Sequence, residues 1–224
     1  MSGFQRYAVY YLPGDAALAA FGASWLGWDV STGTPCGQPL IDGIDRVTET
    51  PRKYGFHGTL KPPFRLAKGT TAKDLNDRIG ELASRTAAIR LEGLRLAKLG
   101  RFLALVPTGD VTALERLAFD CVTEFDAYRD PPTEDELQKR RAVGLTPRQD
   151  AYLSQWGYPY VGDEFRFHLT LSGKLDEAEL ARIRDAAAAI LPPLPEPFEI
   201  ASLSLVGEAE DGKFRQIHRY ALTG

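Results

Sequence analysis

The sequence predicts an α+β protein with two similar lobes of mainly antiparallel sheet, helices outside and a central cleft. One observation is an internal repeat: a strand, a helix and a two-stranded hairpin follow one another over residues 54–106 and again over 165–222. Another is that the repeats open with nearly the same pentapeptide, Phe-His-Gly-Thr-Leu and Phe-His-Leu-Thr-Leu. Repeats of this kind commonly form similar units related by approximate symmetry, and helices with antiparallel strands define the α+β class. We expect residues 1–224 to form a single bilobal domain.

The elements of the first half are bounded by glycine, proline and capping residues. Short alternating apolar runs predict strands, and apolar residues at a spacing of three or four predict helices. We expect strands over residues 6–12, 53–61, 89–98 and 101–106, helices over 15–26, 71–87 and 111–125, and a loop over 31–50.

The second half begins with a change in amino-acid composition. Residues 126–162 contain a proline pair, a charged run and an aromatic segment, and we interpret them as an insertion or crossover. After this segment the first half's pattern returns, with a proline-rich connector over residues 191–197. We expect strands over residues 164–172, 198–206 and 213–222 and a helix over 176–190.

The composition narrows the class of ligand. A formal net charge of −3 and an isoelectric point near 5.7 argue against an electrostatic grip on long nucleic acid. A small phosphorylated substrate remains compatible, because it needs only a local group of cations. The apolar stretch over residues 16–28 is too short to span a bilayer and lacks the flanks of a signal peptide. Cys36 and Cys121 have no metal-binding spacing, and we expect reduced thiols in a cytoplasmic protein.

Alternation along the repeated strands gives each of them one polar face. In the first copy this face carries His57 and Thr59, and in the second it carries His168 and Thr170. Cations that we expect beside a bound phosphate share these faces, namely Lys53, Lys61 and Arg166. If the polar faces meet, two imidazoles and two hydroxyls line one cleft.

Two histidines suit the cleavage of a phosphodiester. One takes a proton from the attacking water while the other donates a proton to the leaving oxygen, and a pKa near 6.5 allows both states at neutral pH. The threonine hydroxyls can donate to the non-bridging phosphate oxygens as charge builds up. A chain of this composition has on the order of 0.2 chance matches to His-x-Thr. A single match is therefore weak and a structural strand histidine would explain it, but two matches in the same frame favour catalysis.

The two pentapeptides resemble the signature of the two-histidine phosphoesterase superfamily, whose His-x-Thr/Ser motif maps onto His57 and Thr59 and onto His168 and Thr170. This resemblance implies a bilobal two-histidine phosphoesterase-like fold, a cleft between lobes, and no metal or other cofactor. The longer segments at residues 25–29, 52–57 and 155–160 resemble a branch encoded in bacterial phosphonate-utilisation operons. We therefore expect hydrolysis of a small cyclic phosphate or phosphodiester of ribose or nucleotide type.

Several other aromatic and basic residues allow more than one interpretation. Trp156 and Tyr158 belong to an aromatic segment that either covers a base or sugar in the cleft or packs between lobes. The basic run over residues 139–141 is interpreted as a solvated helix face, with a phosphate clamp as the alternative. His218 lacks a threonine two positions later and is expected to be structural or on the surface.

Two other functions remain open. One is a non-catalytic protein that binds a nucleotide or phosphonate in the same cleft, although binding alone needs cations rather than two titrating groups. The other is an enzyme that processes RNA ending in a 2′,3′-cyclic phosphate, which the acidic charge balance disfavours. The sequence does not indicate the oligomeric state, which histidine is the acid, or which ester bond breaks.

Overall fold

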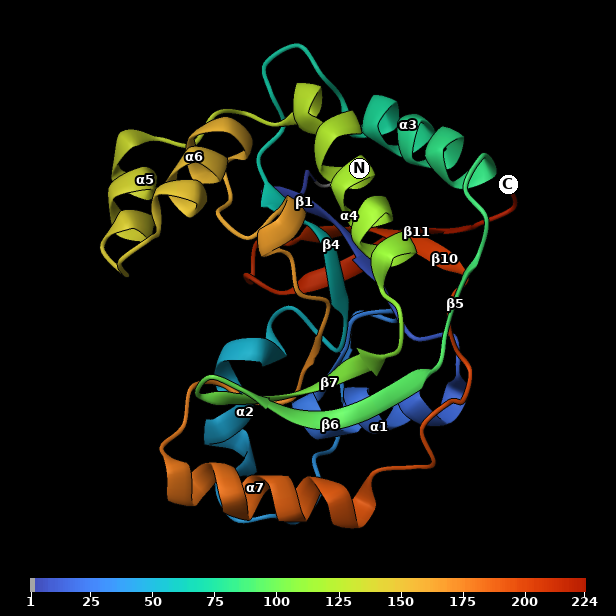
Figure 1. Cartoon of the computed structure of the whole chain (residues 1–224), viewed down its shortest axis with the longest axis vertical. Coiled ribbons are helices and arrows are strands. Elements are labelled where there is room, and N and C mark those ends of the chain that lie inside the picture. Colours follow the sequence, from blue (N-terminus) through green and yellow to red (C-terminus); the bar gives the residue numbers. More distant parts are fainter. Residues whose placement is uncertain (1–2) are drawn as a thin grey trace.

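The computed structural model describes residues 3–224 (Figure 1). Its elements, in chain order, are β1 (Arg6–Tyr11), α1 (Ala16–Leu26), β2 (Trp28–Asp29), β3 (Thr34–Pro35), α2 (Ile44–Arg52), β4 (Gly58–Phe64), α3 (Ala72–Ser84), β5 (Ile89–Leu91), β6 (Gly93–Leu99), β7 (Phe102–Thr108), α4 (Thr112–Glu124), η1 (Asp126–Tyr128), α5 (Glu134–Arg141), α6 (Pro147–Trp156), η2 (Gly162–Glu164), β8 (Leu169–Thr170), α7 (Glu177–Ile190), β9 (Phe198–Ile200), β10 (Ser202–Glu208) and β11 (Phe214–Ala221).

Seven strands form one antiparallel sheet in the order β11-β10-β1-β4-β8-β7-β6. The sheet has two parts, and β4 and β8 meet at a single register pair, Gly58 opposite Leu169. Helices α3 and α4 pack on the part that contains β4, β10 and β11, whereas α7 packs on β6 and β7 (Figure 1). The α+β class with two lobes of antiparallel sheet and outer helices is confirmed.

The two parts of the sheet exchange their hairpins. The hairpin β6–β7 follows α3 in the chain but pairs with β8, and the hairpin β10–β11 follows α7 but pairs with β1. The two segments that cross between the parts, β5 and β9, pair with each other from Ile89 opposite Ile200 to Leu91 opposite Phe198. Each part of the sheet therefore contains strands from both sequence repeats.

Helix α3 shows how the sequence fixes an outer helix. Thr71 and Asp74 form a reciprocal capping box at its start, a device worth roughly 1 kcal/mol. Leu75, Ile79 and Leu82 recur at helical spacing and are buried in the main core. Burial of this apolar face holds α3 against β10 and β11.

The loop expected over residues 31–50 is partly wrong, because α2 occupies its second half. Gly43, in the left-handed region with φ of 69°, precedes the helix. The buried face of α2 consists of Ile44, Val47, Thr48 and Pro51. Their spacing is helical, but two of the four are a threonine and a proline, so the apolar period is hidden in the sequence.

The two motif-bearing strands are shorter than expected. Residues 53–57 follow the end of α2 as a turn and a bend, and β4 begins only at Gly58. Residues 165–168 have no ladder pairing, and β8 consists of Leu169–Thr170. Both histidines therefore lie just before a strand, outside the backbone pairing of the sheet.

Among residues 3–224, no helix combines the length and the apolar character needed to cross a membrane.

Candidate functional site

The imidazole of His57 is held by its own motif and by β1. Its Nδ1 lies 2.8 Å from the Gly55 carbonyl oxygen, and its Nε2 lies 3.0 Å from the Thr59 hydroxyl. A carbonyl oxygen only accepts, so Nδ1 carries the proton and Nε2 accepts from Thr59 in the neutral ring. The ring stacks on the fully buried Tyr10, with 3.7 Å between ring centroids.

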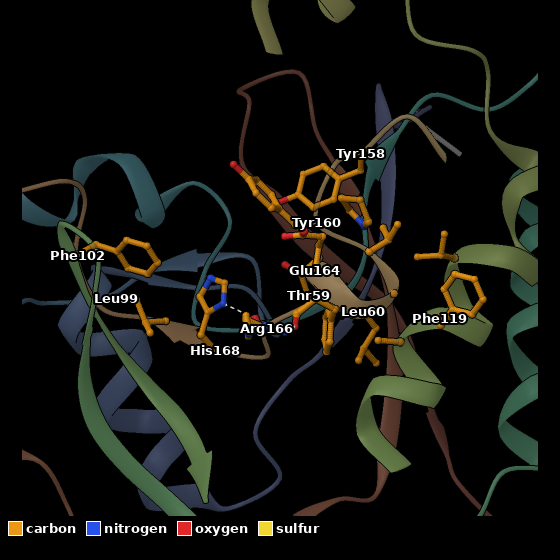
Figure 2. Close-up of a pocket in the computed structure, with 16 residues that line it drawn as sticks. Thr59, Leu60, Leu99, Phe102, Phe119, Tyr158, Tyr160, Glu164, Arg166 and His168 are labelled. Atoms are coloured by element: carbon orange, nitrogen blue, oxygen red, sulfur yellow. Dashed lines mark hydrogen bonds between the residues drawn. The ribbon is translucent and has the colours of Figure 1, made fainter. Parts of the chain in front are cut away.

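The imidazole of His168 is held in the same way. Its Nδ1 lies 2.7 Å from the Arg166 carbonyl oxygen, again two positions earlier in the chain (Figure 2). This contact places the proton of the neutral ring on Nδ1 and leaves Nε2 as the free nitrogen. The Phe102 ring lies 5.5 Å from the His168 ring, centroid to centroid.

Both histidines favour the neutral form in the free protein. Burial lowers the pKa of His57 to about 4, against an opposing effect of the Gly55 carbonyl, and His168 lowers it further. Burial also lowers the pKa of His168, opposed by the Arg166 carbonyl. The effect of His168 on the pKa of His57 is consistent with the placement of the two imidazoles in neighbouring cavities.

The residues of the two motifs line two neighbouring cavities in a crossed arrangement. The first, of about 280 Å³, is lined by His168 of the second motif and Thr59 of the first. The second, of about 250 Å³, is lined by His57 of the first motif and Thr170 of the second. Phe102 lines both cavities. We call the two together the motif cleft.

Each cavity of the motif cleft also has one cation. Arg166, which the sequence predicted here, lines the first cavity, and its guanidinium donates to the carbonyls of Asp163 and Phe165. Lys174 lines the second cavity and is exposed. Each cavity thus combines one imidazole, one motif threonine and one cation, groups that can transfer protons and stabilise negative charge.

The structure does not bring Lys61 into the motif cleft. Thr59 pairs with Tyr10 of β1 but Lys61 pairs with Val9, so the register shifts by one residue between them. This bulge turns Lys61 to the core side of the sheet. Its side chain is 2% exposed, and its amine donates to the Val122 carbonyl in the last turn of α4. Burial lowers the pKa of Lys61 to about 8.

Lys53 and Trp156 also lie outside the two cavities. Lys53 follows α2 and is exposed, with its amine 4.9 Å from the centre of the Tyr54 ring. Trp156 packs edge-on against Phe119, with 6.0 Å between ring centroids. Tyr158, in contrast, lines the first cavity, which is the first of the two positions that the sequence left open (Figure 2).

The cleft contains residues that the sequence reasoning missed. Leu99 and Phe102 flank the turn of the β6–β7 hairpin and reach the cleft from the side opposite Tyr158 and Tyr160 (Figure 2). The only sign of this in the sequence is that both apolar side chains stand beside a tight turn. Lys174 continues the alternation of Thr170 by two further steps, beyond the expected end of the strand.

Glu164 adds a negative group to the first cavity. It lines that cavity near Tyr160 and accepts a hydrogen bond of 2.9 Å from the Gln149 amide (Figure 2). Among the residues that the structure describes, no group of three or more His, Cys, Asp and Glu side chains is arranged to hold a metal ion.

Comparison with known proteins gives one family and several distant structures. The family model described as "Protein of unknown function (DUF1045)" matches residues 59–215, more than half of the chain. This range includes Thr59 and the whole second motif.

Two curated relatives are longer than this chain. Ribose 1,5-bisphosphate phosphokinase PhnN of Janthinobacterium sp. (strain Marseille) is 42% identical over 191 residues, which are 81% of this chain and 42% of the relative. The protein of the same name from Laribacter hongkongensis (strain HLHK9) is 34% identical over 212 residues, or 92% of this chain and 49% of the relative. The chain spans less than half the length of both.

Solved structures match over nearly the entire chain at low identity. They include TT0787 of Thermus thermophilus (TM-score 0.44, 14% identity, 98% of both chains) and a phosphoesterase (TM-score 0.44, 18% identity, 99% and 100%). E. coli LigT in complex with 3′-AMP also matches (TM-score 0.44, 16% identity, 99% and 100%). With TM-scores below 0.5 and identities below 25%, these structures carry no statement about the activity of this chain.

Proposed function

The chain belongs to the DUF1045 family, and from the site that it carries we propose that it is a metal-independent, two-histidine phosphoesterase. Its substrate is a small cyclic phosphate or phosphodiester of ribose or nucleotide type. The observation that carries this proposal is the crossed arrangement in which each cavity of the motif cleft combines a histidine of one motif with the threonine of the other.

The proposed reaction uses the Nε2 atoms of both imidazoles. A bound phosphodiester anion raises the pKa of both imidazoles, and we assign the proton that is taken up to His168. His57 is the base, because its stacking on Tyr10 and its burial keep its pKa low. His57 Nε2 removes a proton from water as the new P–O bond forms, and His168 Nε2 gives its proton to the leaving oxygen as the old P–O bond breaks.

The threonines and cations stabilise the charge on the phosphate. Thr59 donates to His57 Nε2 in the free protein and turns its hydroxyl toward a non-bridging oxygen when the substrate binds. Thr170 is the equivalent donor from the other motif. Arg166 and Lys174 supply one positive charge on each side, which matches a single phosphate group.

The names of the longer relatives describe a kinase. A phosphate loop of the G-x-x-x-x-G-K-[ST] type does not occur in these 224 residues. We therefore base the proposal for this chain on its own two His-x-Thr motifs and not on the names of the relatives. A role in phosphonate use, suggested by the branch that the sequence resembles, is part of the proposal.

The test is an assay of the purified protein against a panel of cyclic phosphates and linear phosphodiesters, with and without a chelator. We expect turnover of at least one small cyclic phosphate, unchanged by the chelator. Loss of activity with the chelator and recovery with one divalent ion would contradict the metal-independent reaction. Tight binding without turnover would favour the non-catalytic binding protein instead.

A further inference from the structure

A third cavity, of about 220 Å³, lies beside the motif cleft, and we call it the basic cavity. Cations from several separate segments converge on it. Its basic side chains are Arg6 from β1, Arg65 after β4, Arg129 after η1, and Lys139 and Arg140 from α5. Two carboxylates line the same cavity, Asp130 and Glu136.

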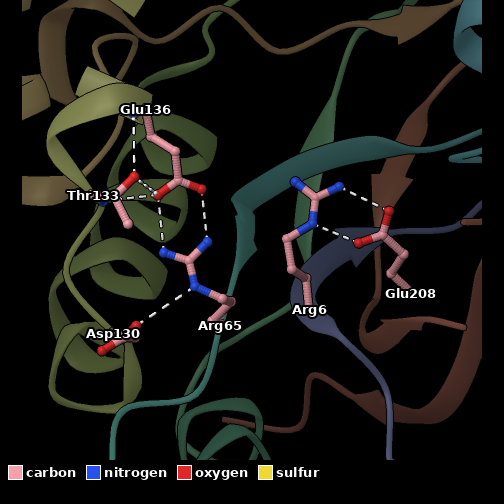
Figure 3. A network of polar contacts seen from close by, with 6 residues as sticks. All are labelled: Arg6, Arg65, Asp130, Thr133, Glu136 and Glu208. Atoms are coloured by element: carbon pink, nitrogen blue, oxygen red, sulfur yellow. Dashed lines mark hydrogen bonds and ion pairs between the residues drawn. The ribbon is translucent and has the colours of Figure 1, made fainter. Parts of the chain in front are cut away.

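Two of the five cations are neutralised by carboxylates. Arg6 makes two hydrogen bonds to Glu208, of 2.5 and 2.8 Å (Figure 3). Arg65 makes two hydrogen bonds to Glu136, of 2.7 and 2.9 Å, and approaches Asp130 to 3.5 Å (Figure 3). Arg65 holds the pKa of Glu136 at about 2, so this carboxylate remains ionised. These pairs fix the walls of the basic cavity and leave their two arginines little charge for a ligand.

The other three cations are not fully matched. Arg129 pairs with Asp126 through Nε, but its Nη1 is buried and has no hydrogen-bond partner. Arg140 and Lys139 are exposed, and among residues 3–224 neither of them forms an ion pair. A buried guanidinium donor without an acceptor is costly, roughly 1–3 kcal/mol. An anion in the basic cavity would relieve this cost and balance two free charges.

The basic cavity adjoins the motif cleft through Tyr158. A small void of about 20 Å³ shares Tyr158 and Val161 with the first cavity of the cleft, and it shares Arg129 and Arg140 with the basic cavity. The Arg140 guanidinium lies 5.1 Å from the centre of the Tyr158 ring. Tyr158 therefore lies at the border between the motif cleft and Arg140 of the basic cavity.

Arg6 gives a second connection on the other side. Burial raises the pKa of Tyr10 well above its usual value, Tyr54 raises it further, and Arg6 acts in the opposite direction. The guanidinium of Arg6 thus lies within electrostatic range of the ring that stacks on His57. The Arg6 guanidinium lies 5.9 Å from the centre of the Phe214 ring, and the Phe214 ring lies 5.9 Å from the Tyr10 ring, centroid to centroid.

We propose that the basic cavity binds a phosphate monoester group, and that the substrate of the motif cleft is a cyclic phosphodiester that carries this second phosphate. The second statement rests on the proposed function. A phosphate dianion matches the two unpaired charges of Lys139 and Arg140 and supplies an acceptor for Arg129 Nη1. The same chemistry fits either the second phosphate of the substrate or a free phosphate ion, and the two are separated by experiment.

The first experiment titrates inorganic phosphate into the protein and follows the amide resonances of α5 and residues 126–130 by NMR. We expect saturable shifts there, and at least about tenfold weaker binding in Arg140→Gln, because one charge-assisted contact is lost. Arg141→Gln is the matched control: it removes the same charge from the next residue of α5, but Arg141 binds Asp150 and does not line the basic cavity. Equal weakening by both variants, or no saturable shift, would overturn the site.

The second experiment compares a nucleoside 2′,3′-cyclic phosphate with the same compound carrying a 5′-phosphate. We expect the wild-type protein to prefer the 5′-phosphorylated compound in kcat/KM, and Arg140→Gln to reduce this preference at least about tenfold while Arg141→Gln keeps it. Absence of any preference, with phosphate binding at α5 intact, would assign the cavity to a free ion and overturn the substrate statement. Failure of the proposed function is seen separately, as no turnover of either compound with phosphate binding at α5 intact.

Discussion

The imidazoles of His57 and His168 each donate from Nδ1 to the carbonyl of the residue two positions earlier. For His57 this carbonyl belongs to Gly55, which has φ of 73°, a left-handed conformation that favours glycine. The contact fixes the tautomer and leaves Nε2 of both rings for proton transfer. The same device in both motifs explains why two short, unpaired segments can hold their histidines in place.

Replacement of these histidines gives the first prediction. We expect His57→Ala and His168→Ala each to lower turnover by at least about 10²-fold, as for the loss of a general acid or base. Neither histidine belongs to a helix or a strand, so the circular dichroism spectrum should remain that of the wild type. Near-wild-type turnover by either folded variant would remove that histidine from the mechanism.

The lowered pKa of His57 gives a prediction for stability. The folded protein holds this pKa at about 4 and the unfolded chain at about 6.5, so below pH 6.5 the unfolded state binds more protons. Protonation of His57 therefore does not change the free energy of unfolding above pH 6.5. As the pH falls from 6.5 to about 4, it lowers this free energy progressively. We expect His57→Gln to lose less thermal stability than the wild type between pH 7 and pH 4.5. His218→Gln is the control, since His218 is exposed on β11, and an equal pH dependence of all three proteins would contradict the assignment.

The threonine hydroxyls give a third prediction. Thr59→Val and Thr170→Val keep the β-branched shape and remove only the donor, so we expect kcat to fall on the order of 10²-fold with little change in melting temperature. Serine at either position should restore much of the activity, because it retains the hydroxyl. A large loss of stability with unchanged activity per folded molecule would make these hydroxyls structural.

The neighbours of the histidines show how far alternation along a strand can predict a site. It correctly indicates that each threonine shares a cavity with a histidine, and it places Arg166 there. It fails at Lys61, because a bulge between β4 and β1 leaves no local trace in the sequence. Lys174 takes the place of a predicted cation, since the alternation extends past the short β8.

At the scale of elements, the two motifs meet where β4 and β8 pair through Gly58 and Leu169. A Cβ on Gly58 would lie 2.3 Å from the Phe167 ring, so the ring occupies the space that a side chain would need. This contact explains why the first motif has glycine where the second has leucine.

Gly58→Ala therefore tests the junction of the two strands. We expect a loss of roughly 1–3 kcal/mol in the free energy of unfolding from overpacking, measured by urea denaturation, with reduced turnover as β8 shifts. Gly37→Ala is the control, because a Cβ there meets no atom within 4 Å. Phe167→Leu in the same chain should recover part of the loss. If Gly58→Ala is as stable and active as the control, the close packing is not what joins the strands.

Elements whose pattern is purely local are the ones that the sequence predicts well. Helix α3 has an apolar period and a capping box, and both are visible in the sequence. Helix α2 buries Thr48 and Pro51 in place of apolar residues, and β8 has only two ladder residues, whose partners in β4 and β7 lie far away in the chain. Long-range pairing decides such elements, and a single sequence does not contain it.

At the scale of the whole molecule, the repeats over residues 54–106 and 165–222 are visible in the sequence, but the exchange of their hairpins is not. Strand β7 of the first hairpin pairs with β8, and β10 of the second hairpin pairs with β1, so each part of the sheet depends on both repeats. Because the sheet is continuous across Gly58 and Leu169, the two histidines are fixed relative to each other by backbone hydrogen bonds. The motif cleft is thus a property of both repeats together.

The size and charge of the whole chain give the last prediction, that the substrate is small. The net charge of −3 repels a long polyanion, and the motif cleft offers one cation in each cavity, enough for one phosphate group. Salt dependence scales with the number of phosphates that a protein neutralises: six to ten contacts cost about 10³–10⁵ in affinity between roughly 50 and 200 mM salt. With one or two contacts, kcat/KM for a small cyclic phosphate should change by less than about tenfold over that range. The comparison is an oligonucleotide that ends in a 2′,3′-cyclic phosphate, assayed at the same salt concentrations. A strong preference for the oligonucleotide that grows as salt is lowered would identify RNA ends as the substrate and exclude the small ester.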